Sequence, residues 1–578
     1  MDDAFERLRQ RKIVQWAIAY FAVAFALIQV LDLVGQRFGW PDWIARAAIV
    51  VAAIGFAITL VLAWYHGERG QQRVTAIEIA VVAILVAIGG AWVWHVAHPA
   101  AVATAETTAA PTPSASAKDL RSIAVLPLVN TSGDPGNEYF SDGLSEELIS
   151  VLARVPDLKI IGRTSSFRFK NTNDDSRTIG ERLGVAHLLE GSVRKQGERV
   201  RIAVDLIAAA DGRQLWSETY DRELKDIFAV QSEIAGAVVE QLKVKLLGRA
   251  SAALATTREP SLPAYTALLQ GAHLLPNFNE TNLRKSIVYF EEATRLDPEY
   301  ALAYARLAAA WRSLAALYLS EPDAIADAYR RAGEAADKAL QLDPSISEAY
   351  TARAYLKLTA TFDLAGAESD FRRAADLAPS DYRPIDGLAY LLAAQGRLDD
   401  AEATALRATD LDPLSITPLF NLARIRMASG RLDEAETNIR KAIALQPDLS
   451  HAHAYLVVID LLRNDAVVAQ RDADQEPAGF WRDYAITLAK QRSGDSAAAD
   501  ATLQSMIDKY SYGGPFQIAT VYALRKEPDR VFEWLDRALE TRDAGLTQLF
   551  VTPFLLDYRD DPRFAAIAAK IGVDTKPH

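Results

Sequence analysis

Proline recurs at a nearly fixed interval through the second half of this 578-residue chain. Pro379, Pro413 and Pro447 are 34 residues apart, and Pro344 precedes them by 35. Each proline ends a variant of Leu-Asp-Pro, and alanine stands five and twelve residues before each one. Such a period indicates one repeated supersecondary unit, which cannot bury its apolar face without neighbours. The second half is therefore expected to be a stack of units rather than a single core.

The residue types in this period indicate pairs of helices. Alanine lets two helices pack closely, and proline ends the second helix because it lacks a backbone N–H. A 34-residue period with these features is the signature of the tetratricopeptide repeat. We predict an all-α solenoid over 251–578, with five regular repeats and three weaker ones after Pro447. The 46-residue gap from Pro298 to Pro344 predicts an elongated helix or an inserted turn.

The first helix of each pair in such a solenoid is expected to line a concave groove. In the predicted register, Tyr390, Phe420 and Arg424 face this groove. We predict that these three residues bind a protein or peptide partner, and the alternative is ordinary surface packing.

Three long apolar stretches occupy the first hundred residues. Ile13–Leu31 and Ala47–Tyr65 each contain 19 residues without a charge, and Val74–Val96 contains one charge, Glu78. An α-helix needs about 20 such residues to cross the bilayer core, so we predict three transmembrane helices within 13–96. A cleaved signal peptide is the alternative for the first stretch, but a small-residue cleavage site is missing. Glu78 is either an ion or proton ligand or, as we favour, a side chain that reaches the cytoplasmic interface.

Basic residues predict the orientation of these helices. Arginine and lysine gather in residues 1–12 and again between the second and third stretches. The positive-inside rule then places the N-terminus in the cytoplasm of a bacterium and everything after about residue 97 in the periplasm. Residues 97–118 are rich in Ala, Thr, Pro and Ser and are expected to be a flexible tether.

The segment 119–250 has the pattern of an α/β domain. An apolar run at 122–129 predicts a buried strand, and apolar residues on one face of 141–155 predict a helix. Apolar and polar residues alternate over 200–206, which indicates a half-buried strand. Strands that alternate with helices predict one α/β sandwich.

Two passages of this segment carry a family resemblance. They are IAVLPLVNTSGDPGNEYFSDGLSEELISVLARVPDLKIIGRTSSF, from Ile123, and IGERLGVAHLLEGSVRKQGERVRIAVDLIAAADGRQLWSETYDREL, from Ile179. Both closely resemble a bacterial domain described as FlgO-like or TolB amino-terminal-like, which recurs in inner-membrane proteins ahead of tetratricopeptide repeats. Many relatives carry a winged-helix or adenylate-cyclase domain before the membrane. Only about a dozen residues precede the first stretch here, so the resemblance implies neither output.

Composition and motifs argue against several kinds of site. Without cysteine there is no disulfide or thiolate metal site, and the net charge of −12 makes the chain a poor partner for nucleic acid. His451 and His453 are two residues apart on a predicted helix and point in different directions. Glu146 and Glu147 are adjacent, whereas acid–base catalysis needs groups that converge from different elements. We predict no catalytic, metal or cofactor site.

These patterns favour a non-enzymatic scaffold, anchored in the inner membrane, that binds protein or peptide partners in the periplasm through its solenoid. The alternative is a sensor that relays a periplasmic state to a cytoplasmic regulator. An enzyme would need a polar pocket within 120–245. The sequence leaves open the partner, the ligand of the α/β domain and the oligomeric state.

Overall fold

The computed structural model describes four ranges of the chain and three isolated residues. The ranges are 119–242, 258–275, 279–319 and 321–573, and the isolated residues are Tyr20, Ala24 and Phe56. All four ranges belong to one compact unit. The three predicted transmembrane helices and the predicted tether fall outside the described residues, apart from those three positions. No helix in the described part combines the length and the apolar character that crossing a membrane requires.

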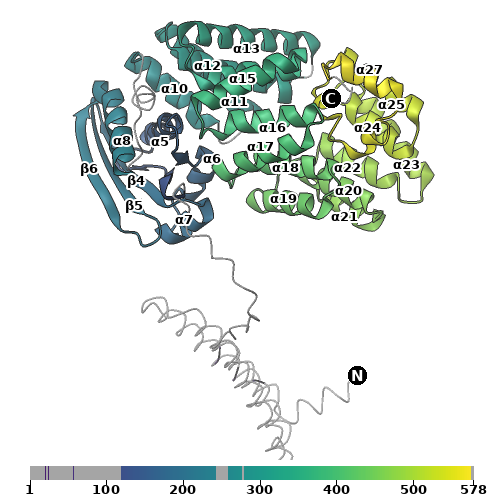
Figure 1. The fold of residues 1–578 in the computed structure, drawn as a ribbon, viewed down its shortest axis with the longest axis horizontal. Helices are drawn as coiled ribbons and strands as arrows, with labels where there is room; N and C mark the ends of the chain where they lie inside the picture. Colours follow the sequence, from purple (N-terminus) through teal and green to yellow (C-terminus); the bar gives the residue numbers. More distant parts are fainter. Residues whose placement is uncertain are drawn as a thin grey trace, which may run out of the picture. The chain divides into compact units, whose positions relative to one another are not determined.

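Residues 119–242 form an α/β domain around a mixed sheet with the strand order β3-β1-β4-β5-β6, in which β2 also pairs with β4 (Figure 1). Strand β1 runs parallel to β3 and β4, whereas β4, β5 and β6 are antiparallel neighbours. The alternating segment at 200–206 lies in β5, and its apolar side chains are buried. The strands are β1 Ser122–Val125, β2 Val129–Asn130, β3 Lys159–Ile160, β4 His187–Gln196, β5 Arg199–Ala208 and β6 Gln214–Glu223.

Helices cover both faces of this sheet. On one face, apolar residues of α5 and α8 form a core with the strands. On the other face, Phe169 of η3 and Ile179 of α7 form a second, smaller core. Gly184 ends α7 in the left-handed conformation, with φ of 64°. The helices are α5 Glu138–Ala153, α6 Arg163–Ser166, α7 Ser176–Leu183 and α8 Ile227–Gln241, with short 3-10 turns η1 Asp119–Arg121, η2 Pro135–Asn137, η3 Phe167–Phe169 and η4 Leu224–Asp226.

The remaining described residues form a tetratricopeptide-repeat solenoid of many helices, so the mixed α/β region is followed by a repeat region as predicted. Helix α12 has 17 residues and α13 has 21, whereas α16 and α17 have 13 and 14, and these longer helices account for most of the wide gap between Pro298 and Pro344. The pairs are α10 Leu262–Leu274 with α11 Glu280–Leu296, α12 Ala301–Leu317 with α13 Pro322–Leu342, α14 Ser347–Leu356 with α15 Leu364–Leu377, α16 Tyr382–Ala394 with α17 Leu398–Leu411, α18 Ile416–Ala428 with α19 Leu432–Leu445, α20 Ala452–Leu462 with α21 Ala466–Gln475, α22 Phe480–Lys490 with α23 Ser496–Tyr510, and α24 Pro515–Arg525 with α25 Pro528–Glu540.

Small residues allow helices that follow one another in the chain to cross closely, both within a pair and between successive pairs. A Cβ atom added to Gly387 of α16 would lie 2.2 Å from the ring of Phe371, which belongs to the preceding helix α15. In the first pair, a Cβ atom on Gly271 would lie 2.5 Å from the ring of Phe290. The first helices of successive pairs, such as α12, α14 and α16, also contact one another and form the inner face of the solenoid.

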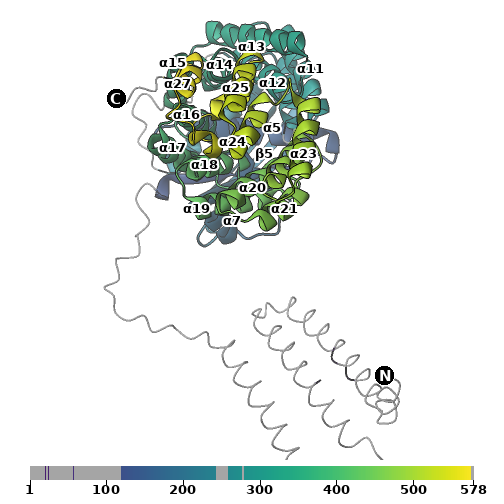
Figure 2. The same ribbon diagram turned by 90° about the vertical axis from the view of Figure 1, so that its right-hand side faces the viewer.

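After the last pair, the chain returns to the inner face. The 3-10 turn η6 spans Ala544–Gln548, α26 spans Pro553–Leu556, and α27 spans Pro562–Lys570. The turn η6 contacts α16 and α24, and α26 contacts α18. The helices of the last repeats face the viewer in Figure 2.

Candidate interaction surfaces

The structure brings two of the three predicted binding residues together. Tyr390 lies on α16 and Arg424 on α18, and the guanidinium carbon of Arg424 lies 4.6 Å from the centre of the Tyr390 ring. Phe420 lies one turn before Arg424 and is buried, with its ring against those of His451 and Tyr455. Phe420 therefore contributes to packing between repeats rather than to an open surface.

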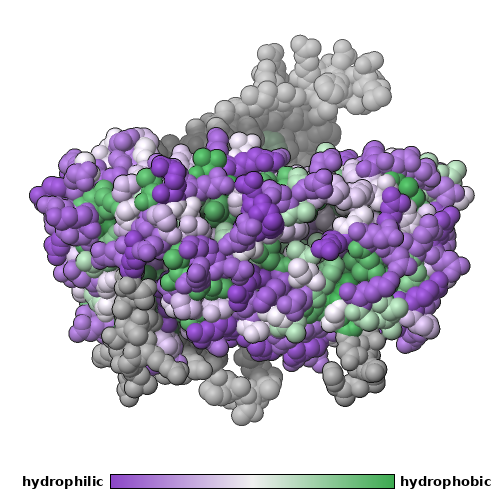
Figure 3. Space-filling view, turned by 90° about the horizontal axis from the view of Figure 1, so that it is seen from above, coloured by the Kyte–Doolittle hydropathy of each residue, from purple (hydrophilic) through white to green (hydrophobic). Residues whose placement is uncertain are grey.

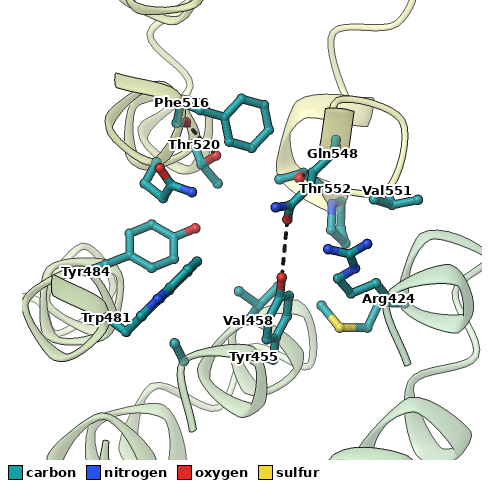
Figure 4. Close-up of a pocket in the computed structure, with 14 residues that line it drawn as sticks. Arg424, Tyr455, Val458, Trp481, Tyr484, Phe516, Thr520, Gln548, Val551 and Thr552 are labelled. Atoms are coloured by element: carbon teal, nitrogen blue, oxygen red, sulfur yellow. Dashed lines mark hydrogen bonds between the residues drawn. The ribbon is translucent and has the colours of Figure 1, made fainter. Parts of the chain in front are cut away.

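The chain's own C-terminal segment, residues 544–556, covers this part of the inner face. The hydroxyl groups of Tyr390 and Thr547 are 2.5 Å apart, and the Tyr455 hydroxyl donates a 3.2 Å hydrogen bond to Oε1 of Gln548. In Figure 4, Arg424 points toward the segment that carries Gln548, Val551 and Thr552. The cavity that remains measures only about 30 Å³. A segment of a partner cannot enter here unless residues 544–556 leave.

His451, which precedes the first residue of α20, and His453, which lies within α20, face different surroundings, as the sequence predicted. His451 packs between the rings of Phe420 and Trp481, and burial lowers its pKa to about 4. His453 instead lies 3.9 Å from a carboxylate oxygen of Asp472. Within the described ranges, no group of three or more His, Cys, Asp or Glu side chains has a metal-binding arrangement.

A buried arginine joins the solenoid to the α/β domain. Arg306 of α12 forms ion pairs of 2.9 Å with Glu146 and 3.0 Å with Glu147, both on α5. Burial pushes the pKa of Glu146 upward, but the guanidinium groups of Arg306 and Arg163 outweigh it and lower this pKa. Burial raises the pKa of Glu147 despite Arg306. The adjacent carboxylates therefore hold two domains together, a role that their spacing in sequence did not reveal.

The turn between α17 and α18 forms a second junction. The carboxylate of Asp412 accepts a 2.8 Å hydrogen bond from the backbone N–H of Ser165, and Leu411 O accepts one from Gly162 N. Arg168 donates to the carbonyl oxygens of Leu414 and, in the next repeat, Leu445.

Apolar side chains also cross between the domains. Tyr265 and Leu269 of the first repeat helix belong to the core of α5 and α8, and Leu414 belongs to the smaller core on the other face. The α/β domain and the solenoid therefore share hydrophobic cores and form one body.

A larger cavity lies on the inner face of the early repeats. It measures about 290 Å³ and is lined mainly by α12, α14 and α16, together with Glu146 of α5 and Leu283 of α11. Its wall holds several arginines and carboxylates as well as alanine and leucine side chains. Sequence reasoning missed this cavity; charged residues on successive first helices were the available signal. The charged and tyrosine residues of the wall are Glu146, Arg306, Arg312, Glu348, Tyr355, Tyr382, Arg383 and Asp386.

The outer surface offers apolar side chains in small groups. Figure 3 shows hydrophobic residues in small patches among hydrophilic ones on the face that it views. Exposed large apolar residues include Val288 on α11, Leu317 on α12 and Val467 on α21, which lie on different repeats. Single exposed apolar side chains of this kind are normal on a protein surface.

Comparison with known proteins supports the repeat region. The family model described as tetratricopeptide repeat matches residues 416–449, which hold α18 and α19. A curated protein of Rhizobium meliloti, named putative adenylate cyclase 3, is 39% identical over 199 residues. The match covers 34% of this chain and 34% of that protein, so the chain spans about a third of the relative's length.

Several solved structures share helical repeats with this chain at low similarity. Pseudomonas aeruginosa PilF is 17% identical, with a TM-score of 0.31 over 39% of this chain and 98% of that chain. PilW, described as a type IV pilus biogenesis factor, is 18% identical, with a TM-score of 0.29 over 45% of this chain and 99% of that chain. Likenesses at these scores carry no argument about ligands or partners.

Proposed function

We propose that this protein is a non-enzymatic scaffold that binds protein or peptide partners through its repeat solenoid. The observation that supports it best is the single body made by the solenoid and the α/β domain, locked by the buried Arg306. Tetratricopeptide solenoids offer extended surfaces for other chains, and a rigid body holds bound partners in a fixed arrangement.

We further propose that the α/β domain belongs to the FlgO-like or TolB amino-terminal-like group, and that three helices anchor the protein in a bacterial inner membrane. The resemblance of the passages from Ile123 and Ile179 supports the first point. The apolar stretches within 13–96 and their basic flanks support the second and place residues after about 97 in the periplasm.

The position of the C-terminus tests this topology. Alkaline phosphatase fused after His578 is expected to be active and a cytoplasm-dependent fluorescent protein to be dark, because the first needs the periplasm to fold. An inactive phosphatase fusion together with a fluorescent second fusion would refute the periplasmic location, and the scaffold would then act in the cytoplasm.

The partner surface is testable by placing a photo-crosslinking amino acid on the full chain in intact cells. At Val467, which is 82% exposed on α21, or at the exposed Leu317, we expect capture of another protein. At Tyr390 we expect an internal crosslink to the segment around Thr547. Capture of partners at Tyr390 would show that residues 544–556 leave the inner face, and capture of no protein at any of the three positions would contradict the proposal.

A second function, transmembrane signalling, has one observation in its favour: the curated relative is named putative adenylate cyclase. In this case the protein would relay a periplasmic state to a cytoplasmic regulator. Replacing residues 13–96 with one unrelated membrane anchor separates the two functions. A scaffold needs only the anchor and retains its function, whereas a relay loses it.

A further inference from the structure

The 290 Å³ cavity on the inner face contains one arginine, Arg312, that has no ion pair with any carboxylate in the part of the chain that the structure describes. Arg312 of α12 contributes to the wall, and its guanidinium carbon lies 4.9 Å from the centre of the Tyr355 ring. Its Nη2 donates a 3.0 Å hydrogen bond to the Ser313 hydroxyl, but its buried Nε has no hydrogen-bond partner. Tyr355 and Tyr329 favour the charged form of Arg312 and act to raise its pKa. Burial has the larger effect and lowers the pKa of Arg312.

The other arginines of the wall are neutralised. Arg306 pairs with Glu146 and Glu147, and Arg383 pairs with Asp381 at 2.7 Å and Glu348 at 3.6 Å. Among the described residues, no carboxylate forms an ion pair with Arg312. A half-buried guanidinium without a counter-charge is costly, and a bound carboxylate would remove that cost by accepting hydrogen bonds from it.

The walls favour a ligand with an apolar body. Leu275, Leu283 and Ala309 line the cavity beside the charged groups. A volume of about 290 Å³ is at the small end of the range that holds small molecules. An extended peptide would need a groove that continues along the inner face, whereas residues 544–556 fill that face at Tyr390 and Arg424 and α5 borders the cavity at Glu146.

We propose that this cavity binds a small carboxylic acid with a short apolar body, whose carboxylate is held by the guanidinium of Arg312. Glu146 and Arg306, which form the ion pair between the domains, line the same cavity. An occupant therefore contacts both domains and stabilises their docked arrangement. This site is independent of the protein-binding surfaces proposed above.

The test is calorimetric titration of the purified full chain with butyrate, hexanoate, benzoate and phenylacetate, each beside its neutral primary amide. We expect at least one acid to bind at one molecule per chain, at least tenfold more tightly than its amide. The same acid should raise the melting temperature, because a ligand that binds only the folded state stabilises it.

Three variants assign the binding to this site. Arg312→Gln is expected to weaken it at least tenfold, and Arg312→Lys to retain part of the affinity, because an ammonium group attracts a carboxylate without bidentate geometry. Arg330→Gln is the matched control, since Arg330 is exposed on α13 and paired with Asp327 and Glu334. If Arg312→Gln fails to fold, Ala309→Leu should reduce binding by filling the cavity.

Three results would overturn the proposal. The first is that none of the four acids binds at 10 mM. The second is that an acid binds equally well to wild type and to both Arg312→Gln and Ala309→Leu. The third is that only peptides with a free C-terminal carboxylate bind in an Arg312-dependent way, which would make the cavity a peptide site.

Discussion

The hydroxyl groups of Tyr390 and Thr547 lie 2.5 Å apart, although 157 positions separate them in the chain. This contact fastens the segment after the last helix pair to the inner face of the fourth pair. Leu546 and Leu549, which flank the contact, are fully buried. The segment 544–556 is therefore part of the hydrophobic core of the later repeats, and the predicted binding residues Tyr390 and Arg424 lie beneath it.

Shortening Leu549 should loosen this part of the solenoid. We expect Leu549→Ala to lower the free energy of unfolding by about 2 to 5 kcal/mol, because it leaves a cavity in a packed core. In the same variant, the hydrogen-exchange rates of the backbone amides in α16 and α18 should rise. Leu406→Ala, at a 46% exposed position on α17, is the control and should change stability by no more than about 0.5 kcal/mol. Equal effects of the two variants would show that the segment is not packed on the inner face.

Removing Arg306, the buried arginine between the domains, should strongly destabilise the folded protein. Arg306→Leu leaves Glu146 and Glu147 buried without their shared partner, and breaking a buried pair in this way costs about 3 to 5 kcal/mol. Denaturant unfolding measures the loss, and limited proteolysis should then cut between the two domains. Arg295→Leu, which removes an exposed pair with Glu292, is the control. A wild-type proteolysis pattern in Arg306→Leu would mean that the shared apolar cores suffice to dock the domains.

Asp412 should make stability depend on pH. Burial raises the pKa of Asp412 to about 6, whereas an aspartate in an unfolded chain titrates at about 3.9. Between about pH 4 and pH 6 the unfolded chain has lost a proton that the folded protein keeps, so this group's contribution to stability falls as pH rises and levels off above pH 6.

Asp412→Asn removes this dependence while its amide oxygen can still accept from Ser165 N. At pH 7.5 we expect the variant to be more stable than wild type by up to about 3 kcal/mol, the equivalent of two pKa units. Thermal unfolding across pH 4 to 8 measures it, with the exposed Asp410→Asn as the control. A variant that is less stable than wild type at pH 7.5 would show that the carboxylate charge supports the junction.

Two glycine substitutions should have opposite effects. A Cβ atom on Gly387 would lie 2.2 Å from the Phe371 ring, so Gly387→Ala should cost about 1 to 3 kcal/mol through overpacking. Gly333 lies within α13 with no neighbouring atom inside 4 Å of an added Cβ atom, so Gly333→Ala should stabilise by up to about 1 kcal/mol through helix propensity. Equal melting temperatures for the two variants would contradict the close crossing at Gly387.

The sequence by itself determined the local elements and the repeat architecture. The recurrence of proline and alanine every 34 residues predicts the helix pairs, and the alternation in β5 has the two-residue period of a strand. Both patterns lie in residues close together in the sequence, so they can be recognised without the rest of the fold.

Only the tertiary structure decided which surfaces are open. The sequence showed Glu146 and Glu147 only as adjacent carboxylates, yet Arg306, about 160 positions later, forms ion pairs with both of them between two domains. Tyr390 and Arg424 contact each other, but residues 544–556 cover that part of the inner face, while the part that holds Arg312 keeps a cavity. Burial depends on contacts between segments far apart in sequence, and no local pattern carries that information.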